Sequence, residues 1–491
     1  MSQQSPVIEG RSRSSVRVRE WLVATFGGST LAFTAWGLGG VQMWTLHVLL
    51  VGGFFTLSSA VINVSFSKFP YFSLSSQALL RLISWPPFWF SFLFLLYLLI
   101  GALNPAAELF RDERGWWVEA VQAPLATWLP ISVRSEYQPM NAWRVLVSFT
   151  ATFTLIWGLW AGLTRRKPVL IVLWCLLLNG VGMGLIAILQ HLTEAKAVLW
   201  TFPSSNENFW GSFFYRNQAA AYLNLILIAS GVLFFYHAKR ALEFAKSGGP
   251  HFLCFVFFAL TAASIGLALS RGGILFGGIL TSAFLALLVL FGLQSIFHLR
   301  SLWLSLIPVV ILGLGAAMAV SYIDFDAIEE RFGNIGETIE TADQDARAIS
   351  SKATWEMAQE RLVLGWGAGS FRYIFPMYQR NYPEIHYVRF HQKKGWVGRR
   401  MYNYAHNDIV QFLAEYGAIG SGLMLLTLIW ILLSAFRIFS FSAFFLLVGF
   451  ATSISHAFLD FIFNSPAYWM AFTTLLAVSS KLLQMEASRR W

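Results

Sequence analysis

The stretch Tyr402–Gly420 (YNYAHNDIVQFLAEYGAIG) places His406, Asn407 and Asp408 directly before a long apolar run. Asn and Asp are favoured capping residues, so a helix is predicted from about Ile409, with Asn407 or Asp408 as its N-cap. The positive end of the helix dipole disfavours a charged imidazolium and attracts phosphate. A neutral His406 could therefore accept a proton. The alternative is an interfacial histidine that only hydrogen-bonds to a loop.

Arginines form the second candidate group. Arg271 interrupts about forty apolar residues (252–293) within Ser-Arg-Gly-Gly, and such a residue is costly in a membrane unless it is paired or at the surface. Its alternative role is a turn residue whose side chain reaches the lipid headgroups. Arg216, in YRNQ, and Arg347, at the start of a loop helix, are each more typical of structural positions when taken alone.

Together, these three arginines and the basic run that contains Arg389, Arg399 and Arg400 could form a pocket for a polyanion. Guanidinium groups bind phosphate through two hydrogen bonds, which suits a diphosphate. The alternative for the basic run is a solvated surface or a contact with anionic headgroups.

Other patterns carry less information. The segment GWGAGSF at 365–371 lacks the strand–turn–helix context of a nucleotide site and is predicted to be a turn. His386 and His391 have no neighbouring carboxylate pattern, so neither a metal site nor a cofactor is predicted. His456 and Asp460 lie four residues apart on one helix face, as either a second pair near the site or a packing hydrogen bond.

The composition indicates a membrane protein. Of the 491 residues, 56% are hydrophobic and only 12% are charged, against about 25% charged in soluble domains. Repeated apolar runs of about 20 residues are long enough to cross a bilayer. The sequence therefore predicts an all-α, polytopic bundle of membrane helices. The net charge of +10 fits the positive-inside pattern, and no motif for nucleic acid accompanies it. Both cysteines lie in apolar runs, so no disulfide framework is expected.

The alternation of apolar runs with Lys and Arg clusters predicts about twelve spans, with both termini in the cytoplasm. The predicted organisation is an N-terminal tail (1–20), nine spans (21–322), a long outer loop (323–408), three spans (409–484) and a C-terminal tail (485–491). No internal repeat is evident, so an inverted-repeat transporter gains no support.

Two outer segments carry further expectations. The loop 104–142 contains Trp116 and Trp117, which favour an interfacial amphipathic segment. The long loop is acidic over 323–345 and basic over 346–407. A short helix is predicted at 346–362, because Arg347 and three later residues recur at helical spacing.

Six motifs in a fixed order resemble those of the O-antigen ligase and polymerase superfamily, over roughly residues 200–470. They are YRNQAAAYL, ALSRGGIL, RAISSKATW, LGWGAGSFRYIFPMY, AHNDIVQFLAEYGAIG and HAFLDFIFNSPA. The resemblance implies a GT-C-like membrane fold and a metal-independent glycosyltransferase of the bacterial inner membrane. Such enzymes take a glycan from a polyprenyl (undecaprenyl) diphosphate carrier at the periplasmic face.

The resemblance also implies roles for residues. His406 would activate or position the acceptor hydroxyl, Arg271 and Arg347 would bind the diphosphate, and Arg216 matches an arginine of one subgroup. We therefore expect these first three residues to be catalytic. The residues expected to contact substrate are Arg216, Asn407, Asp408, Arg389, Arg399 and Arg400. Guanidinium groups can stabilise a diphosphate leaving group without a metal, and no carboxylate pair of glycosidase type is evident. Attack opposite the diphosphate would invert the anomeric configuration.

A ligase that uses a lipid A–core type acceptor is expected. The alternative within the superfamily is a polymerase that extends a carrier-linked glycan, and the alternative from another class is a transporter or flippase of a lipid-linked glycan. A transporter would place charged or broken helices near the middle of the membrane, whereas the prominent charges here cluster at the outer rim. The oligomeric state is not indicated by the sequence.

Overall fold

The computed structural model describes residues 6–65, 71–113, 115–121, 126–136, 140–246, 248–296, 346–391, 395–437 and 440–488. The helices in these ranges are α1 (Pro6–Trp36), η1 (Leu38–Gly40), α2 (Met43–Val61), α3 (Ser76–Ile83), α4 (Pro86–Leu103), α5 (Ala142–Gly162), α6 (Arg166–Leu192), α7 (Arg216–Glu243), α8 (His251–Leu267), α9 (Arg271–Ile296), α12 (Ala346–Glu360), α13 (Phe371–Ile374), α14 (Pro376–Gln379), α15 (Pro383–His386), α16 (Asp408–Leu433), η2 (Ser434–Arg437), α17 (Phe441–Ala457), η3 (Ile462–Asn464) and α18 (Pro466–Ala487). The strands are β1 (Ile62–Ser65), β2 (Tyr71–Leu74), β3 (Pro105–Asp112), β4 (Gly115–Ala120), β5 (Ser132–Arg134), β6 (Tyr387–His391) and β7 (Gly395–Arg399).

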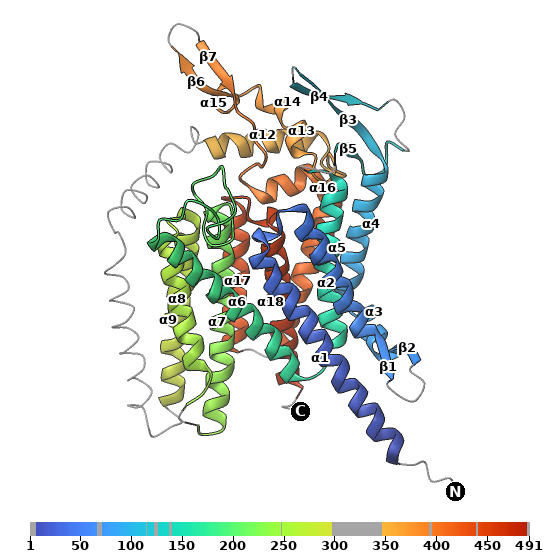
Figure 1. Ribbon diagram of the computed structural model, residues 1–491, viewed down its shortest axis with the longest axis vertical. Coiled ribbons are helices and arrows are strands. Elements are labelled where there is room, and N and C mark those ends of the chain that lie inside the picture. The colour runs from blue at the N-terminus through green and yellow to red at the C-terminus, as the bar shows by residue number, and fades with distance from the viewer. Residues whose placement is uncertain are drawn as a thin grey trace.

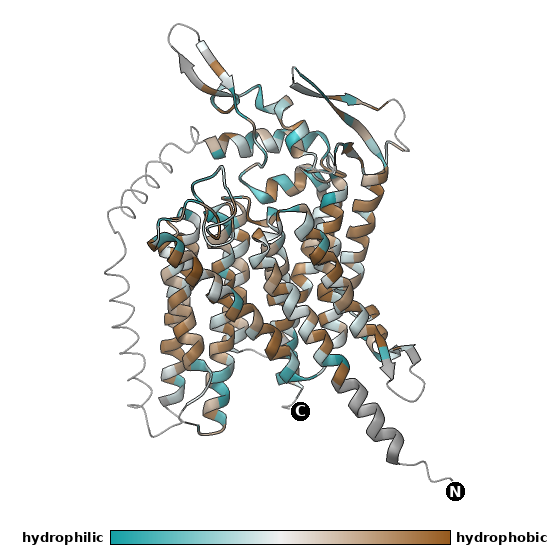
Figure 2. Ribbon diagram, in the orientation of Figure 1, coloured by the Kyte–Doolittle hydropathy of each residue, from teal (hydrophilic) through white to brown (hydrophobic). Residues whose placement is uncertain are grey.

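The long helices form one bundle whose middle is apolar and whose two ends are polar (Figure 2). Within the described ranges, seven helices are long and apolar enough to cross a membrane, namely α2, α4, α5, α6, α7, α9 and α16. Two shorter apolar helices, α8 and α17, pack among them. The predicted helical membrane bundle is confirmed, whereas the count of twelve spans is not. The predicted span at 303–322 and the acidic part of the long loop lie outside the described residues.

Helix α7 lies at the centre of the part of the bundle that α6, α8, α9, α17 and α18 form. Its most apolar window is wholly buried, because it packs against α6, α8, α9, α17 and α18. A helix that is apolar on all sides must be buried in protein or in lipid, and protein surrounds α7. Small residues allow close contact: an ideal Cβ on Gly231 would lie 2.2 Å from a Phe445 ring carbon. The first residue of α7, Arg216, is thereby held at one end of a rigid element.

The polar N-terminal segment continues directly into the first helix of the bundle. Helix α1 begins at Pro6, so most of the tail expected at 1–20 is helical. The last two residues of this tail contact other elements. Arg19 donates to Ser75 (2.6 Å), and the fully buried Glu20 pairs with Arg165. A buried carboxylate needs such a partner, which explains why the chain is ordered before its first apolar run.

The segment 104–142, expected to be an interfacial amphipathic stretch, contains a small sheet instead. Strand β3 pairs antiparallel with β4 and parallel with β5. Trp116 on β4 packs edge-to-face on Tyr373 of the long loop, with 6.1 Å between ring centroids. Apolar residues from this sheet and from α12–α15 form a second, smaller core outside the bundle. Trp116 therefore contributes to packing within the protein, whereas Trp117 is exposed.

Figure 1 shows α12 lying across one end of the bundle, with the β3–β4 and β6–β7 hairpins projecting from the same end. We call this the capped end. Helix α1 begins, and α18 ends, at the opposite end (Figure 1). Two predictions about local structure are confirmed: a helix forms at Ala346–Glu360, and the apolar run at 252–293 is divided into α8 and α9 just before Arg271.

Candidate functional site at the capped end

The site begins at a bend in α16. Gly417 has φ 61° and ψ −173°, so the helix is interrupted after two turns. An ideal Cβ at this position would lie 2.4 Å from the carbonyl oxygen of Val363, which only glycine can accept. The glycine-rich turn at 365–371 fits against the bend: Trp366 N donates to Ala414 O (2.8 Å), and Gly367 N donates to Glu415 O (2.8 Å). The first two turns of α16 are thus fixed to the loop.

Asn407 is the N-cap of α16, and its Oδ1 accepts a hydrogen bond from Val410 N at 3.2 Å. His406, the preceding residue, has φ 57°, in the left-handed region that histidine adopts more readily than most residues. This conformation turns the imidazole toward the loop that joins α17 to α18. The His406 side chain is 26% exposed, so it is partly enclosed and still accessible.

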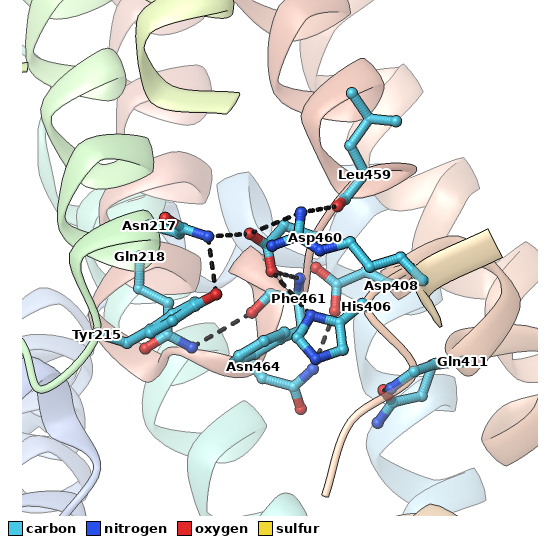
Figure 3. Close-up of polar contacts among 12 residues, drawn as sticks. Tyr215, Asn217, Gln218, His406, Asp408, Gln411, Leu459, Asp460, Phe461 and Asn464 are labelled. Carbon is cyan, nitrogen blue, oxygen red and sulfur yellow. Dashed lines mark hydrogen bonds and ion pairs between the residues drawn. The ribbon is translucent and has the colours of Figure 1, made fainter. Parts of the chain in front are cut away.

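Asp460 lies opposite His406. Its Oδ1 is 3.5 Å from His406 Nδ1, longer than a well-formed hydrogen bond but close enough to orient the ring (Figure 3). The same carboxylate accepts from Asn217 Nδ2 at 2.6 Å and from Phe461 N at 2.9 Å. Arg347 Nη1 lies 3.9 Å from Oδ2 and donates to Leu459 O at 3.3 Å. Asp460 therefore joins α7, α12 and the segment before α16.

The contacts around Asp460 keep it ionised. Burial by itself would raise its pKa, but the contact with His406 and the positive charge of Arg347 lower the pKa below its ordinary value of 3.8. The Asp460 side chain is only 5% exposed. A buried carboxylate that stays charged can hold the proton of an imidazole Nδ1, which leaves Nε2 to act as an acceptor.

Arg216 and Arg347 act on the same neighbourhood. Burial raises the pKa of Tyr215 to about 12, with a further rise from the charge of Asp460 and opposing effects from Arg347 and Arg216. All three charged groups therefore lie within electrostatic range of one phenol. Tyr215 OH accepts from Asn217 Nδ2 at 2.8 Å. The Arg347 side chain is 45% exposed, so its guanidinium is accessible to a ligand while it contacts Asp460.

Arg271 is exposed at the first residue of α9, at the same end of the bundle. The next residue, Gly272, packs on His456: an ideal Cβ there would lie 2.5 Å from His456 Nε2. His456 lies in the last turn of α17, and its carbonyl oxygen accepts from Asp460 N at 3.1 Å. His456 thus connects the start of α9 with the Asp460 loop.

Asp408 lies under the site and not on its surface. The side chain is fully buried, and it accepts hydrogen bonds from Phe463 N (2.7 Å) and Asn464 Nδ2 (2.9 Å). Asn407 is 8% exposed and occupied with the cap. These two residues, predicted to contact substrate, are placed so that they join α16 to η3 and hold His406 and Asp460 in register.

The basic run of the long loop is not brought to His406. Arg389 and Arg399 lie on β6 and β7, in the hairpin that projects from the capped end (Figure 1). Arg399 and Arg400 are exposed, and Arg400 Nη2 donates to Val388 O at 3.2 Å within the hairpin. The side chain of Arg389 lies outside the described residues.

Several residues of the site were missed by sequence reasoning. Asn217 holds Asp460 and stands next to Arg216 in YRNQ, a motif in which only the arginine was considered. Phe461 is stacked between other rings of the site, and Asn464 fixes Asp408; both belong to HAFLDFIFNSPA. For Asn217, the available signal was an amide next to a charged residue at the start of an apolar run.

In chemical terms, the site places an imidazole, a group that can accept a proton, near a guanidinium group, which can pair with an anion. The imidazole is that of His406, beside Asp460, and the guanidinium is that of Arg347. Among the residues that the structure describes, no group of three or more His, Cys, Asp and Glu side chains could hold a metal ion.

The fold and the site define a polytopic helical membrane protein with a histidine–arginine centre at one end. Residues 256–425, roughly a third of the chain, match the family model described as O-antigen ligase. The match confirms the resemblance to the O-antigen ligase and polymerase superfamily and supports a glycosyltransferase-like function of this general type. It includes His406, Arg271 and Arg347, whereas Arg216 and Asp460 lie outside it. No match is found among curated proteins.

Proposed function

We propose that this protein transfers a glycan from a polyprenyl diphosphate carrier to an acceptor hydroxyl. The observation that carries the proposal is the meeting of His406, Asp460 and Arg347 at the capped end of the bundle, with contacts of 3.5 and 3.9 Å around one buried carboxylate. Undecaprenyl diphosphate is the carrier proposed, and the capped end is the periplasmic face of an inner-membrane protein with both termini in the cytoplasm.

The reaction is an inverting displacement without a metal. The acceptor oxygen attacks the anomeric carbon, and the bond from this carbon to the diphosphate oxygen breaks with its electron pair leaving on the diphosphate. His406 Nε2 takes the hydroxyl proton while Asp460 holds Nδ1. Arg347, with Arg271 and Arg216, stabilises the charge that develops on the diphosphate. Asn407 and Asp408 position the histidine. More distant parts of the glycan contact Arg389, Arg399 and Arg400.

The transfer assay uses the full chain in liposomes with an undecaprenyl-diphosphate-linked glycan and a lipid A–core acceptor. His406→Ala should insert normally and lose transfer by about 100-fold or more, since general-base catalysis contributes at least that much. His191→Ala, which changes an exposed histidine at the end of α6, is the control. Full activity of His406→Ala would contradict the proposal.

The product distinguishes ligase from polymerase, which share the carrier and the site. We favour a ligase, for which loss of the protein leaves long chains on the carrier. Single repeat units on the carrier would indicate a polymerase. A transporter or flippase would move lipid-linked glycan across liposomes without a new glycosidic bond.

A further inference from the structure

A cavity of about 470 Å³ opens at the capped end, between α2, α5, α16 and α18. This volume lies within the range of small-molecule sites, roughly 300–1,000 Å³. It is bounded on one side by Tyr404, Phe463 and Asn464, the last two of which also bond to Asp408. The cavity therefore adjoins the His406 centre and shares its supporting loop.

Phe461 lies between the cavity and the side of the site that holds Arg347. Tyr215 stacks on this ring at 5.0 Å between centroids, and Tyr404 stacks on it at 4.6 Å. Two rings at such distances cannot share one face of a phenyl group, so they lie on opposite faces. Tyr215 is joined through Asn217 to the Asp460 carboxylate that Arg347 contacts, whereas Tyr404 lines the cavity. His406 meets the edge of Phe461 at 4.7 Å and 81°, between the two sides.

The lining of the cavity has the chemistry of a saccharide site. Aromatic rings, including Phe412 and Trp469, offer apolar faces, while Ser148 and Gln411 offer hydrogen bonds. Two guanidinium groups, Arg144 and Arg372, also line it.

One carboxylate, Glu415, lies beside them, but it is 5% exposed and accepts from Phe371 N at 3.0 Å. Positive charge thus predominates on the accessible wall. A purely apolar occupant such as a lipid chain would leave these polar groups without hydration.

We infer that this cavity is the acceptor subsite and that it binds a saccharide carrying an acid group, a carboxylate or a phosphate, paired with Arg372 and Arg144. The inference rests on the proposed function. In an inverting displacement, the nucleophile approaches from the side opposite the leaving group. If the diphosphate lies by Arg347 and Arg271, the acceptor must come from the other side of Phe461, which is where the cavity lies.

The test is a binding measurement that needs no transfer. The full chain in lipid nanodiscs is titrated with two probes of equal ring number, the acidic tetrasaccharide of hyaluronan and neutral chitotetraose, followed by saturation-transfer NMR. Wild type should prefer the acidic probe. Arg372→Ala should weaken that probe by about 10- to 100-fold, the equivalent of one charged hydrogen bond, and leave the neutral probe unchanged.

Ser148 provides a matched pair of variants, because its side chain lines the cavity on α5. Ser148→Trp should fill the space and weaken both probes, whereas Ser148→Ala should leave both unchanged. His191→Ala, at an exposed position at the end of α6, should also leave probe binding unchanged. Equal melting temperatures verify that the variants are folded.

Three outcomes would overturn the inference: no binding to wild type, equal binding of the two probes, or acidic binding that survives Arg372→Ala and Ser148→Trp. None of these bears on whether His406→Ala loses transfer. Conversely, full transfer by His406→Ala would contradict the proposed function and leave the binding results standing, so the two failures are distinguishable.

Discussion

Asp460→Asn is the most informative single substitution in the site. It preserves the shape of the side chain and removes its charge. Asn217 Nδ2, now 2.6 Å from a carboxylate oxygen, would face an amide that can accept on only one side. Either orientation of the amide turns its NH2 group toward two of the four contacts of the carboxylate, and the expected cost is about 1–3 kcal/mol in stability. The protein should therefore still fold.

The effect on activity should be much larger than the effect on folding. Without the carboxylate, nothing at 3.5 Å selects the His406 tautomer in which Nδ1 carries the proton. We expect transfer to fall by about 10²- to 10⁴-fold, the range that general-base catalysis contributes. Asp112→Asn, on an exposed end of β3, is the matched control and should keep full activity.

The stability of the folded protein should also depend on pH through Asp460. Because folding lowers the pKa of Asp460, its ionised form stabilises the folded protein above the ordinary value of 3.8. This stabilisation is lost as the pH falls through the lower folded value. Asp460→Asn should lack that loss. A folded Asp460→Asn protein with full transfer would refute the role assigned to the carboxylate.

Three further predictions concern neighbouring positions. Arg347→Ala should lower transfer by about 10- to 100-fold in liposomes, whereas Arg399→Ala, in the projecting hairpin, should change it less than threefold; equal effects would count against a diphosphate role for Arg347. Gly272→Ala should cost about 1–3 kcal/mol, because its Cβ would meet an imidazole nitrogen at 2.5 Å, while Gly278→Ala, with no neighbour within 4 Å and inside α9, should not lower the melting temperature, since alanine favours a helix. Asn407→Ala should lose about 1 kcal/mol by removing the cap of α16, and Asn407→Ser should restore it; identical melting temperatures would disprove the cap's importance.

The class of fold was predictable because it depends on composition and local chemistry. Apolar runs of bilayer length specify spanning helices wherever they occur, and the break before Arg271 and the helix at Ala346–Glu360 follow from local sequence signals. The cap at Asn407 was one of two options, and the structure selects it because its Oδ1 reaches Val410 N. The sheet at β3–β5 was not foreseen, since Trp116 finds its partner, Tyr373, far along the chain.

The site also has features that were predictable from the sequence and features that depend on tertiary packing. The sequence by itself determined that His406 stands at a helix mouth and that arginines recur at the ends of apolar runs, because residue type and periodicity decide these features. It left open whether Asp460 belonged to the site or only packed on its own helix. Only the tertiary structure brings Asp460 to His406 and Arg347 and leaves the hairpin arginines apart. Such pairings depend on how α7, α12 and α16 pack, and no local pattern encodes that packing.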